Sequence, residues 1–184
     1  MIIFWVVLGV VVLSFLWVIA TYNDLIQMRV NTQNGWSQID IQLQRRHDLI
    51  PNLVETAKGY MAHERQTLEN VIKARQMAID AASIKDKLQA ENVLTSSLRS
   101  LMAVAENYPN LKADAQMAKV MEELTTTENR IAFARQYYND EAARFNTSVQ
   151  VFPDSLVASL CKFEKMTFFE LQDIGAKQAP QVKF

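Results

Sequence analysis

An uncharged apolar run at the start of the chain constrains its fold most. Residues 2–20 read IIFWVVLGVVVLSFLWVIA, in which only Gly9 and Ser14 interrupt the large apolar side chains. At about 1.5 Å per residue, a helix of this length covers roughly 28 Å, close to the thickness of a bilayer's hydrocarbon core. The run therefore predicts a single transmembrane anchor over residues 1–21.

A cleaved signal peptide, a lipoprotein signal and a buried core helix are the alternatives to an anchor. No Lys or Arg precedes the run and no Cys directly follows it, whereas a cleavable signal has a basic start and a shorter apolar stretch. We therefore expect an uncleaved anchor, with anchor removal to give a soluble periplasmic binder as an alternative. Arg29, Arg45 and Arg46 follow the span, so the positive-inside rule favours a cytoplasmic body.

The composition of the remaining chain favours helices. Four Gly and four Pro among 184 residues leave little turn chemistry for sheets. A net charge of -1 provides no basic field for nucleic acid. The single cysteine, Cys161, cannot form an intramolecular disulfide and is expected to be a small buried apolar residue. These features predict an all-α protein that does not bind nucleic acid.

A helix-like spacing of apolar residues runs from Tyr22 to Tyr60, at steps of three and four. Pro51 cannot donate to the carbonyl of His47, so we expect a kink there, and no reversal because the spacing continues past it. Gly35 is expected to weaken the helix by roughly 1 kcal/mol relative to Ala. The expected core face comprises Leu25, Arg29, Trp36, Ile39, Leu43, Arg46, Ile50, Leu53, Ala57 and Tyr60.

Two further helices are expected, over about residues 63–83 and 84–108, although no Gly or Pro marks the boundary between them. Pro109 disfavours helical geometry at Tyr108 and suits the first turn of a new helix. The second helix is therefore expected to end at Tyr108. The inward residues are expected to be Leu68, Ile72, Ile79 and Ala82 in the first helix, and Leu88, Leu94, Leu98, Leu101 and Ala105 in the second.

The longest later helix is expected to run to about Val149. A short helix over about 154–160 and an extended aromatic segment that clasps the bundle should follow it. The chain should thus comprise an anchor, a long-helix antiparallel bundle of the four-helix type over residues 22–175, and a flexible tail over 176–184. The core face of the long helix is expected to comprise Met117, Met121, Leu124, Glu128, Ile131, Arg135, Tyr138, Ala142, Phe145 and Val149.

Catalytic and metal-binding motifs are not found in the sequence. His47 and His63 lie 16 residues apart, which is roughly 24 Å along a straight helix and too far to share one metal ion. The His63–Glu64 pair lacks the second His of a zinc-protease helix, and four glycines are too few for phosphate-binding loops. We therefore expect no metal, no cofactor and no enzymatic activity.

Charged residues on the apolar faces form the most informative pattern. An unpaired charge inside a bundle would cost several kcal/mol, so we expect ion pairs, with Arg46 to Glu128 as the first candidate. Such buried pairs more often fix helix register and partner choice than perform chemistry. The structural ion-pair candidates are Arg46, Arg75, Glu91, Glu128 and Arg135.

The chain resembles the bacterial LemA family in several ordered blocks. These include YNDLIQMRVNTQNGWSQIDIQLQRRHDLIPNLVETAKGYMAHE, VIKAR, AENYPNLKAD, ENRIAFARQYYND and FPDSLVASLCKFEKMTFFE. The resemblance implies a membrane-anchored antiparallel helical bundle without established catalysis, and hence a location at the bacterial inner membrane. The family more often has Ala at position 35. Some members are lipoproteins whose domain lies outside the cytoplasm, so the side of the membrane stays open.

The resemblance also implies a set of polar motif positions. We expect the protein to act as a structural or interaction module, with a protein partner or a second copy. The alternative is an accessory subunit or enzyme with a polar pocket around Arg45, Arg46, Asp48 and His63, near the kink at Pro51. The matched polar positions are Tyr22, Asn23, Arg45, Arg46, Asp48, Asn52, His63, Glu64, Arg75, Glu106, Glu128, Arg135, Tyr138 and Asn139.

Overall fold

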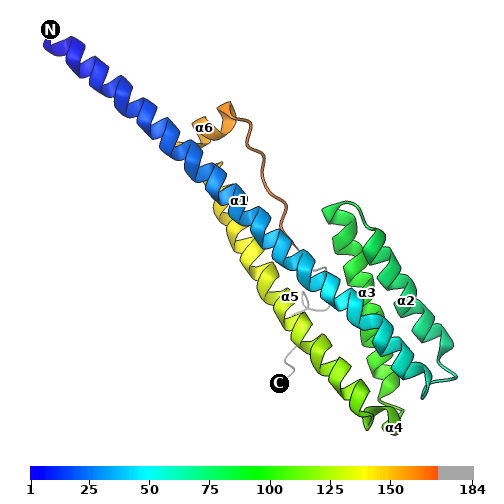
Figure 1. Cartoon of the computed structure of the whole chain (residues 1–184). Helices are drawn as coiled ribbons and strands as arrows, with labels where there is room; N and C mark the ends of the chain where they lie inside the picture. Colours follow the sequence, from blue (N-terminus) through cyan, green and yellow to red (C-terminus); the bar gives the residue numbers. More distant parts are fainter. Residues whose placement is uncertain (170–184) are drawn as a thin grey trace, which may run out of the picture. The chain divides into compact units, whose positions relative to one another are not determined.

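The computed structural model describes residues 1–169, which form six helices and no strand (Figure 1). The expected all-α fold is confirmed. The predicted tail and residues 170–175 of the predicted bundle domain lie outside the described residues. The helices are α1 (Ile2–Lys58), α2 (Arg65–Asp80), α3 (Ile84–Ala105), α4 (Pro109–Lys112), α5 (Ala115–Ser148) and α6 (Asp154–Leu160).

The described residues form two compact units, and the boundary between them falls within α1 and within α5. Unit 1 comprises Met1–Asp40 and Ala132–Phe168, and unit 2 comprises Ile41–Ile131 together with Phe169. This division does not follow the predicted domain limits at residues 21 and 175, which stay a prediction.

Helix α1 joins the apolar run to the amphipathic segment without a break. It continues through Pro51, so the predicted absence of a reversal at this residue is confirmed. Gly35, expected to be a weak point, lies where α5 approaches α1 closely within unit 1. A Cβ added at Gly35 would lie 3.2 Å from the Cα of Tyr138 and 3.3 Å from the ring of Tyr137. The glycine therefore permits a short distance between the two helices.

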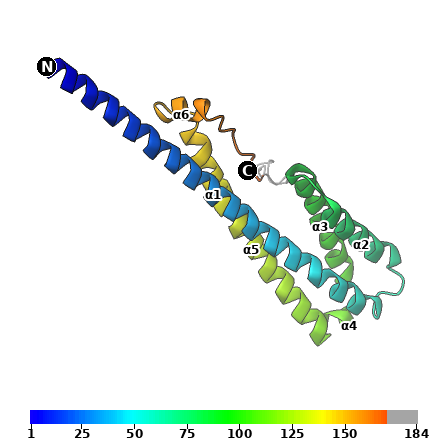
Figure 2. The same cartoon turned by 45° about the horizontal axis from the view of Figure 1, so that its top comes forward.

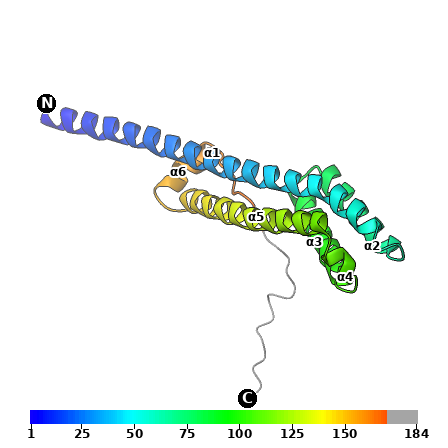
Figure 3. The same ribbon diagram turned by 60° about the horizontal axis from the view of Figure 1, so that its bottom comes forward.

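In unit 1, α1 and α5 lie side by side and antiparallel (Figure 3). Leu25 shares a buried cluster with Phe145, while Trp36, further along α1, stacks edge-on with Tyr138 at a centroid distance of 5.7 Å. The residue numbers thus rise along α1 as they fall along α5. Beyond these contacts, the apolar start of α1 projects past the other elements of the unit.

The segment after α6 is extended and is held along α5. The amide of Asn146 binds both backbone groups of Met166: its Nδ2 donates to the carbonyl at 2.8 Å, and its Oδ1 accepts from the amide nitrogen at 2.7 Å. The hydroxyl of Tyr138 donates to the carbonyl of Thr167 at 2.7 Å. The expected extended segment therefore lies along α5 within unit 1.

In unit 2, four helical segments enclose one apolar core: the last part of α1, all of α2 and α3, and the first part of α5 (Figure 2). Each segment contributes large or small apolar side chains at helical spacing, which explains why all four bury one face. The buried residues include Ile50, Leu53, Val54, Ala57, Leu68, Val71, Ala74, Ala78, Leu94, Leu98, Leu101, Met117, Val120 and Leu124.

The prediction for the buried face of α2 is wrong beyond Leu68. Ile72, Ile79 and Ala82 are exposed, whereas the residues that face the core are Val71, Ala74 and Ala78. The predicted and the observed buried faces of α2 share Leu68 and then differ by one residue position, or about 100° around the helix. The prediction followed the largest apolar side chains, but the interface uses alanines, whose small size suits close helix packing.

Three other burial predictions are also wrong. Tyr60 lies just past the end of α1 and is exposed, because the chain leaves the helix at Lys58. Arg29 lies on the outward side of α1 and is exposed. Cys161, expected to be buried, is exposed at the C-terminal end of α6.

The helix ends carry local signals that explain their positions. Ser83 caps α3 by accepting the amide of Asp86 at 3.0 Å, which fixes the predicted but unmarked boundary before Ile84. Pro109 occupies the first position of α4, as predicted. Asp114 precedes α5, and its Oδ1 accepts the amide of Met117 at 2.8 Å. This hydrogen bond is the largest cause that lowers the pKa of Asp114, followed by the hydroxyl of Tyr60.

Candidate functional site

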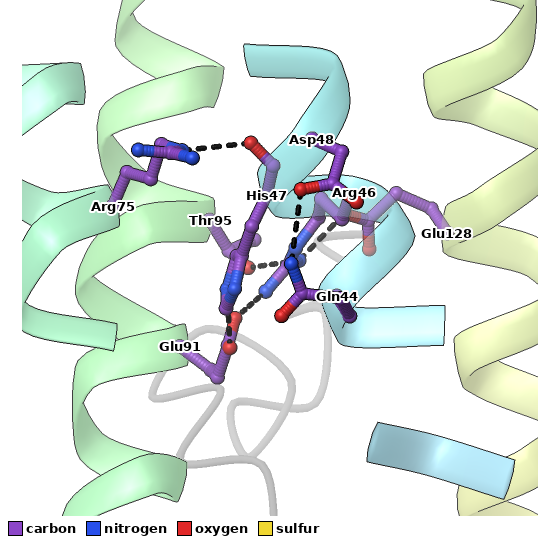
Figure 4. Close-up of polar contacts among 8 residues, drawn as sticks. All are labelled: Gln44, Arg46, His47, Asp48, Arg75, Glu91, Thr95 and Glu128. Carbon is purple, nitrogen blue, oxygen red and sulfur yellow. Dashed lines mark hydrogen bonds and ion pairs between the residues drawn. The ribbon is translucent and has the colours of Figure 1, made fainter. Parts of the chain in front are cut away.

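Arg46 is the centre of a polar network inside unit 2 (Figure 4). Its side chain is 0% exposed. One terminal nitrogen, Nη2, forms an ion pair with Oε2 of Glu91. The other, Nη1, donates to Oε1 of Glu128 at 2.6 Å and to the hydroxyl of Thr95 at 3.1 Å. Arg46 on α1 is thus tied to α3 twice and to α5 once.

Glu91 is shared between Arg46 and His47. Its Oε1 lies 2.8 Å from Nε2 of His47, and its side chain is 1% exposed. Burial raises the pKa of Glu91, but the hydrogen bond from His47 and the charge of Arg46 outweigh burial, so the pKa lies below its ordinary value of 4.5. An ionised carboxylate only accepts hydrogen bonds, so Nε2 of His47 carries the proton in this pair.

Pro51 creates a second polar contact in the same region. Because proline has no amide hydrogen, the carbonyl of His47, one turn earlier on α1, lacks its helical donor. Nε of Arg75 on α2 donates to this carbonyl at 2.7 Å, as Figure 4 shows. The helix therefore passes through Pro51 with the released carbonyl bonded by a neighbouring helix, which connects α1 to α2.

The two carboxylates that pair with Arg46 differ in their exposure to solvent. The Glu91 side chain is 1% exposed, whereas the Glu128 side chain is 40% exposed. In addition, Nε of Arg46 is buried without a hydrogen-bond partner among residues 1–169. We therefore expect the contact between Arg46 and Glu91 to make the largest contribution of this network to the free energy of unfolding.

The predicted ion-pair residues have different places. The structure brings Arg46, Glu91 and Glu128 together, including the pairing of Arg46 with Glu128. Arg75 contacts the backbone of the same site instead of a carboxylate. Arg135 is half-buried and lies in unit 1, whereas Arg46, Glu91 and Glu128 lie in unit 2.

The residues of the alternative pocket differ in burial. Arg46 is buried, whereas Arg45, Asp48 and His63 are all exposed. Asp48 accepts a hydrogen bond at 2.9 Å from Gln44, its neighbour one turn earlier on α1 (Figure 4). Among residues 1–169, no group of three or more His, Cys, Asp or Glu side chains is placed to hold a metal ion.

Most other polar motif positions lie on the surface or support the helix ends. Tyr22, Asn23, Asn52 and Glu106 are exposed, while Asn139 is half-buried. Glu64 accepts from the hydroxyl of Tyr108 at 3.3 Å, and Tyr138 is buried with its hydroxyl bonded to the segment after α6. These contacts are consistent with structural roles.

A groove runs between α3 and α5 in unit 2. Two adjoining hollows of about 290 and 280 Å³ share Met102 and Met121 in their walls. The first hollow also includes Thr95 and Glu128, so it borders the Arg46 network. Methionine side chains are flexible and polarisable, which suits a surface that adapts to an apolar partner.

Two residues of the network were not identified from the sequence as site residues. His47 follows Arg46 directly, and both are buried because the core-facing stripe of α1 is wide enough at this point to include adjacent positions. Thr95 lies four residues after Glu91 on α3, which is one turn along the same face. The spacing to Glu91 could have identified Thr95.

Comparison with known proteins identifies a matching family model and relatives of which this chain covers about seven tenths. A sequence model of the LemA family matches residues 35–184. Magnetosome protein MamQ 2 of Paramagnetospirillum magneticum is 26% identical, over 89% of this chain and 71% of the relative. Protein LemA of Metamycoplasma hominis is 24% identical, over 83% of this chain and 70% of the relative. The names of these relatives state no enzymatic activity. The chain belongs to the LemA family.

Proposed function

We propose that this protein is a single-pass membrane protein whose helical body acts as a structural or protein-interaction module without catalysis. The observation that carries this proposal is the exposure of the apolar start of α1. Every residue from 1 to 16 is exposed, and the most apolar stretch of α1 has no buried residue. A helix that is apolar on all sides needs a surrounding apolar phase, and its length suits a bilayer.

The interior polar network supports a structural role for the body. Its charges bind one another and connect α1 to α2, α3 and α5. Buried polar contacts of this kind select one register among otherwise interchangeable apolar packings. The pocket alternative is not favoured, because Arg46 is buried whereas Arg45, Asp48 and His63 are exposed.

The groove between α3 and α5 supports an interaction role. Three Leu and three Met side chains contribute to its lining, and Arg99, Glu106, Lys112 and Glu128 border it. Apolar floors with charged margins are typical of surfaces that bind another helix or a second copy of the chain. Chemical crosslinking in intact cells and mass determination in mild detergent test this role. A strictly monomeric protein without a reproducible crosslinked partner would contradict it.

The anchor is tested by placing two arginines within the apolar run of the full chain. Leu8→Arg with Val12→Arg is expected to raise the cost of insertion by roughly 5–7 kcal/mol and to release the protein from alkali-washed membranes. Val30→Arg with Ile41→Arg is the matched control, since both side chains are exposed on α1 beyond the run. If the first variant stays with the membrane to the same extent as the control, the anchor is wrong.

The location proposed is the bacterial inner membrane, with the body in the cytoplasm. The basis is the positive charge that follows the run, at Arg29, Arg45 and Arg46. A single cysteine at the exposed Asn34, in a Cys161→Ser background, allows topology to be measured with a membrane-impermeant thiol reagent. Labelling in intact cells would place the body outside. The intact mass of the native protein separates an uncleaved anchor from the soluble periplasmic alternative.

A further inference from the structure

A patch of exposed apolar side chains surrounds α6 in unit 1. Val151 and Phe152 precede the helix, and Leu156 and Leu160 lie on it. The exposed fraction is 76% at Phe152 and 81% at Leu160. Large apolar side chains gathered on a surface mark a contact with another apolar body. These four residues are called the α6 patch below.

The opposite side of α6 is packed against α1. Val157 and Ala158 are buried in a cluster with Leu25, and Trp17 and Val18 pack against the same cluster. Figures 1 and 2 show α6 beside α1 at this point. The position of α6 is therefore fixed by contacts within unit 1, and the α6 patch faces away from those contacts.

The junction of α6 with α1 lies at the end of the apolar run. Trp17 and Val18 belong to the run, and the ring of Phe163, just after α6, lies 6.0 Å from the ring of Tyr22. Tyr22 is two residues beyond Ala20, or about 3 Å along the helix axis. The headgroup region on each side of a bilayer is roughly 5–7 Å thick. When residues 2–20 cross a bilayer, α6 is level with its headgroups.

We propose that the α6 patch inserts into the membrane interface beside the anchor, so that a lipid surface covers it. This inference rests on the proposed anchor and adds a second, separate membrane contact. Residues 151–166 contain two acidic side chains, Asp154 and Glu164, and two basic ones, Lys162 and Lys165, which gives no net charge. The attraction is therefore apolar, and it does not require anionic lipid.

The consequence is a restriction on the orientation of unit 1. A single span leaves a protein able to rotate about the span axis and to tilt. A second contact on one side of α1 removes much of this freedom and fixes which face of unit 1 lies against the membrane. Surfaces of unit 1 opposite α6 would then be presented consistently to a partner in the same membrane.

Cys161 allows the depth of α6 to be measured in the full chain, because it is exposed and directly follows Leu160. The protein carries an environment-sensitive fluorophore on Cys161 and is reconstituted into phosphatidylcholine vesicles. Some vesicles contain lipid with a spin label near the top of the acyl chain. The control is a fluorophore at Asn34→Cys in a Cys161→Ser background, which lies roughly 21 Å beyond Ala20 along α1. We expect spin-labelled lipid to quench Cys161 strongly and Asn34→Cys hardly at all.

A pair of variants tests whether the α6 patch causes the insertion. Leu156→Glu with Leu160→Glu is expected to relieve quenching at Cys161, while helix content stays unchanged because both side chains are exposed. Val30→Glu with Ile41→Glu is the matched control, since both are exposed apolar residues of α1 and neither packs against the cluster that holds α6. It should leave the quenching unchanged, as should replacing part of the phosphatidylcholine with an anionic lipid.

The possible results separate this inference from the proposed anchor. If the protein floats with vesicles but its Cys161 fluorophore is quenched only by a water-soluble quencher, the proposed anchor stands and the inference is overturned. A fluorophore shielded from both quenchers means that protein, and not lipid, covers the α6 patch, which also overturns it. A protein that does not float with vesicles overturns both.

Discussion

Replacing each carboxylate that contacts Arg46 gives a direct test of the buried network. Glu91→Gln and Glu128→Gln make the same chemical change, and both remove a charge paired with Arg46. They differ in surroundings, because the Glu91 side chain is 1% exposed and that of Glu128 is 40% exposed. Any difference in stability therefore reports how burial changes the strength of an ion pair.

The expected cost of Glu91→Gln is about 3 kcal/mol, because removing one partner of a buried pair costs 3–5 kcal/mol and Arg46 keeps Glu128 and Thr95. The same change also weakens the hydrogen bond from His47. Glu128→Gln should cost about 1 kcal/mol or less, because solvent screens the partly exposed pair. A difference of about 2 kcal/mol corresponds to roughly a 30-fold difference in the unfolding equilibrium constant.

The assay is thermal unfolding of the full chain in mild detergent, followed by far-ultraviolet circular dichroism. For a protein of this size, about 3 kcal/mol lowers the melting temperature by roughly 6–12 °C. The double variant Arg46→Met with Glu91→Met is expected to recover part of the loss, because an apolar pair can replace a buried ion pair. Equal costs for the two single variants, or a larger cost for Glu128→Gln, would refute the assignment of the energy to Glu91.

Comparing Glu91→Gln with the wild-type protein also tests how stability depends on pH. Folding lowers the pKa of Glu91, so its ionised form contributes stability above its ordinary pKa of 4.5 and loses this contribution as the pH falls through the lower folded-state value. Wild-type protein should therefore lose stability on acidification below about that pH. Glu91→Gln should show a smaller acid-induced loss. An identical acid slope in both proteins would show that Glu91 titrates alike in the folded and unfolded states.

Three further predictions follow from local contacts. Arg75→Met should lower the free energy of unfolding, measured with denaturant, by about 1.5–3 kcal/mol, because the carbonyl of His47 loses a charged donor. A Pro51→Ala background should reduce this loss, since residue 51 regains an amide that can donate to the same carbonyl. Ser83→Ala should cost about 1 kcal/mol by removing the N-cap of α3, and an unchanged melting temperature would contradict the cap. Gly35→Ala gains roughly 1 kcal/mol of helix propensity, but its methyl group meets the α5 backbone at 3.2 Å. We expect a net loss of stability, and a clear gain would show that α5 can move away.

Helical periodicity predicted the long helices well because one face of each is continuously buried. The three-four spacing correctly identified the core face of α5 from Met117 to Phe145, although part of it is half-buried. It failed in α2, where Ala74 and Ala78 face the core and Ile72 faces outward. The prediction failed there because alanine contributes little to a hydrophobic pattern, even at positions where close helix packing requires a small side chain.

The sequence carries a local capping signal at the start of α3. The boundary before α3 seemed unmarked because it lacks Gly and Pro, yet Ser83 followed three residues later by Asp86 is a capping signal. The exposure of Cys161 could not be predicted in the same way. It depends on which side of the short helix α6 packs against α1, and seven residues are too few for a reliable periodicity.

The polar site was only partly predictable, because spacing shows which side chains turn inward and not which helices become neighbours. Arg46 could be identified because it interrupts an apolar stripe, and Glu128 because it does the same on α5. Placing Glu91 between Arg46 and His47 requires knowing that α3 packs against α1 at that level. The use of Arg75 for a backbone carbonyl depends likewise on the path of α2 past Pro51.

The motif Arg45–Arg46–His47–Asp48 shows how one short stretch serves two environments. Successive residues of a helix are about 100° apart, so Arg46 and His47 enter the core while Arg45 and Asp48 remain on the surface. Replacing Arg46 alone is therefore expected to lower stability, so a loss of function in such a variant does not by itself identify a binding role. Arg45 and Asp48 have no comparable buried contacts, and surface substitutions usually change stability by less than about 0.5 kcal/mol. A functional defect caused by changing Arg45 or Asp48 would thus indicate a contact with a partner or a membrane surface, which makes these two positions the informative half of the motif.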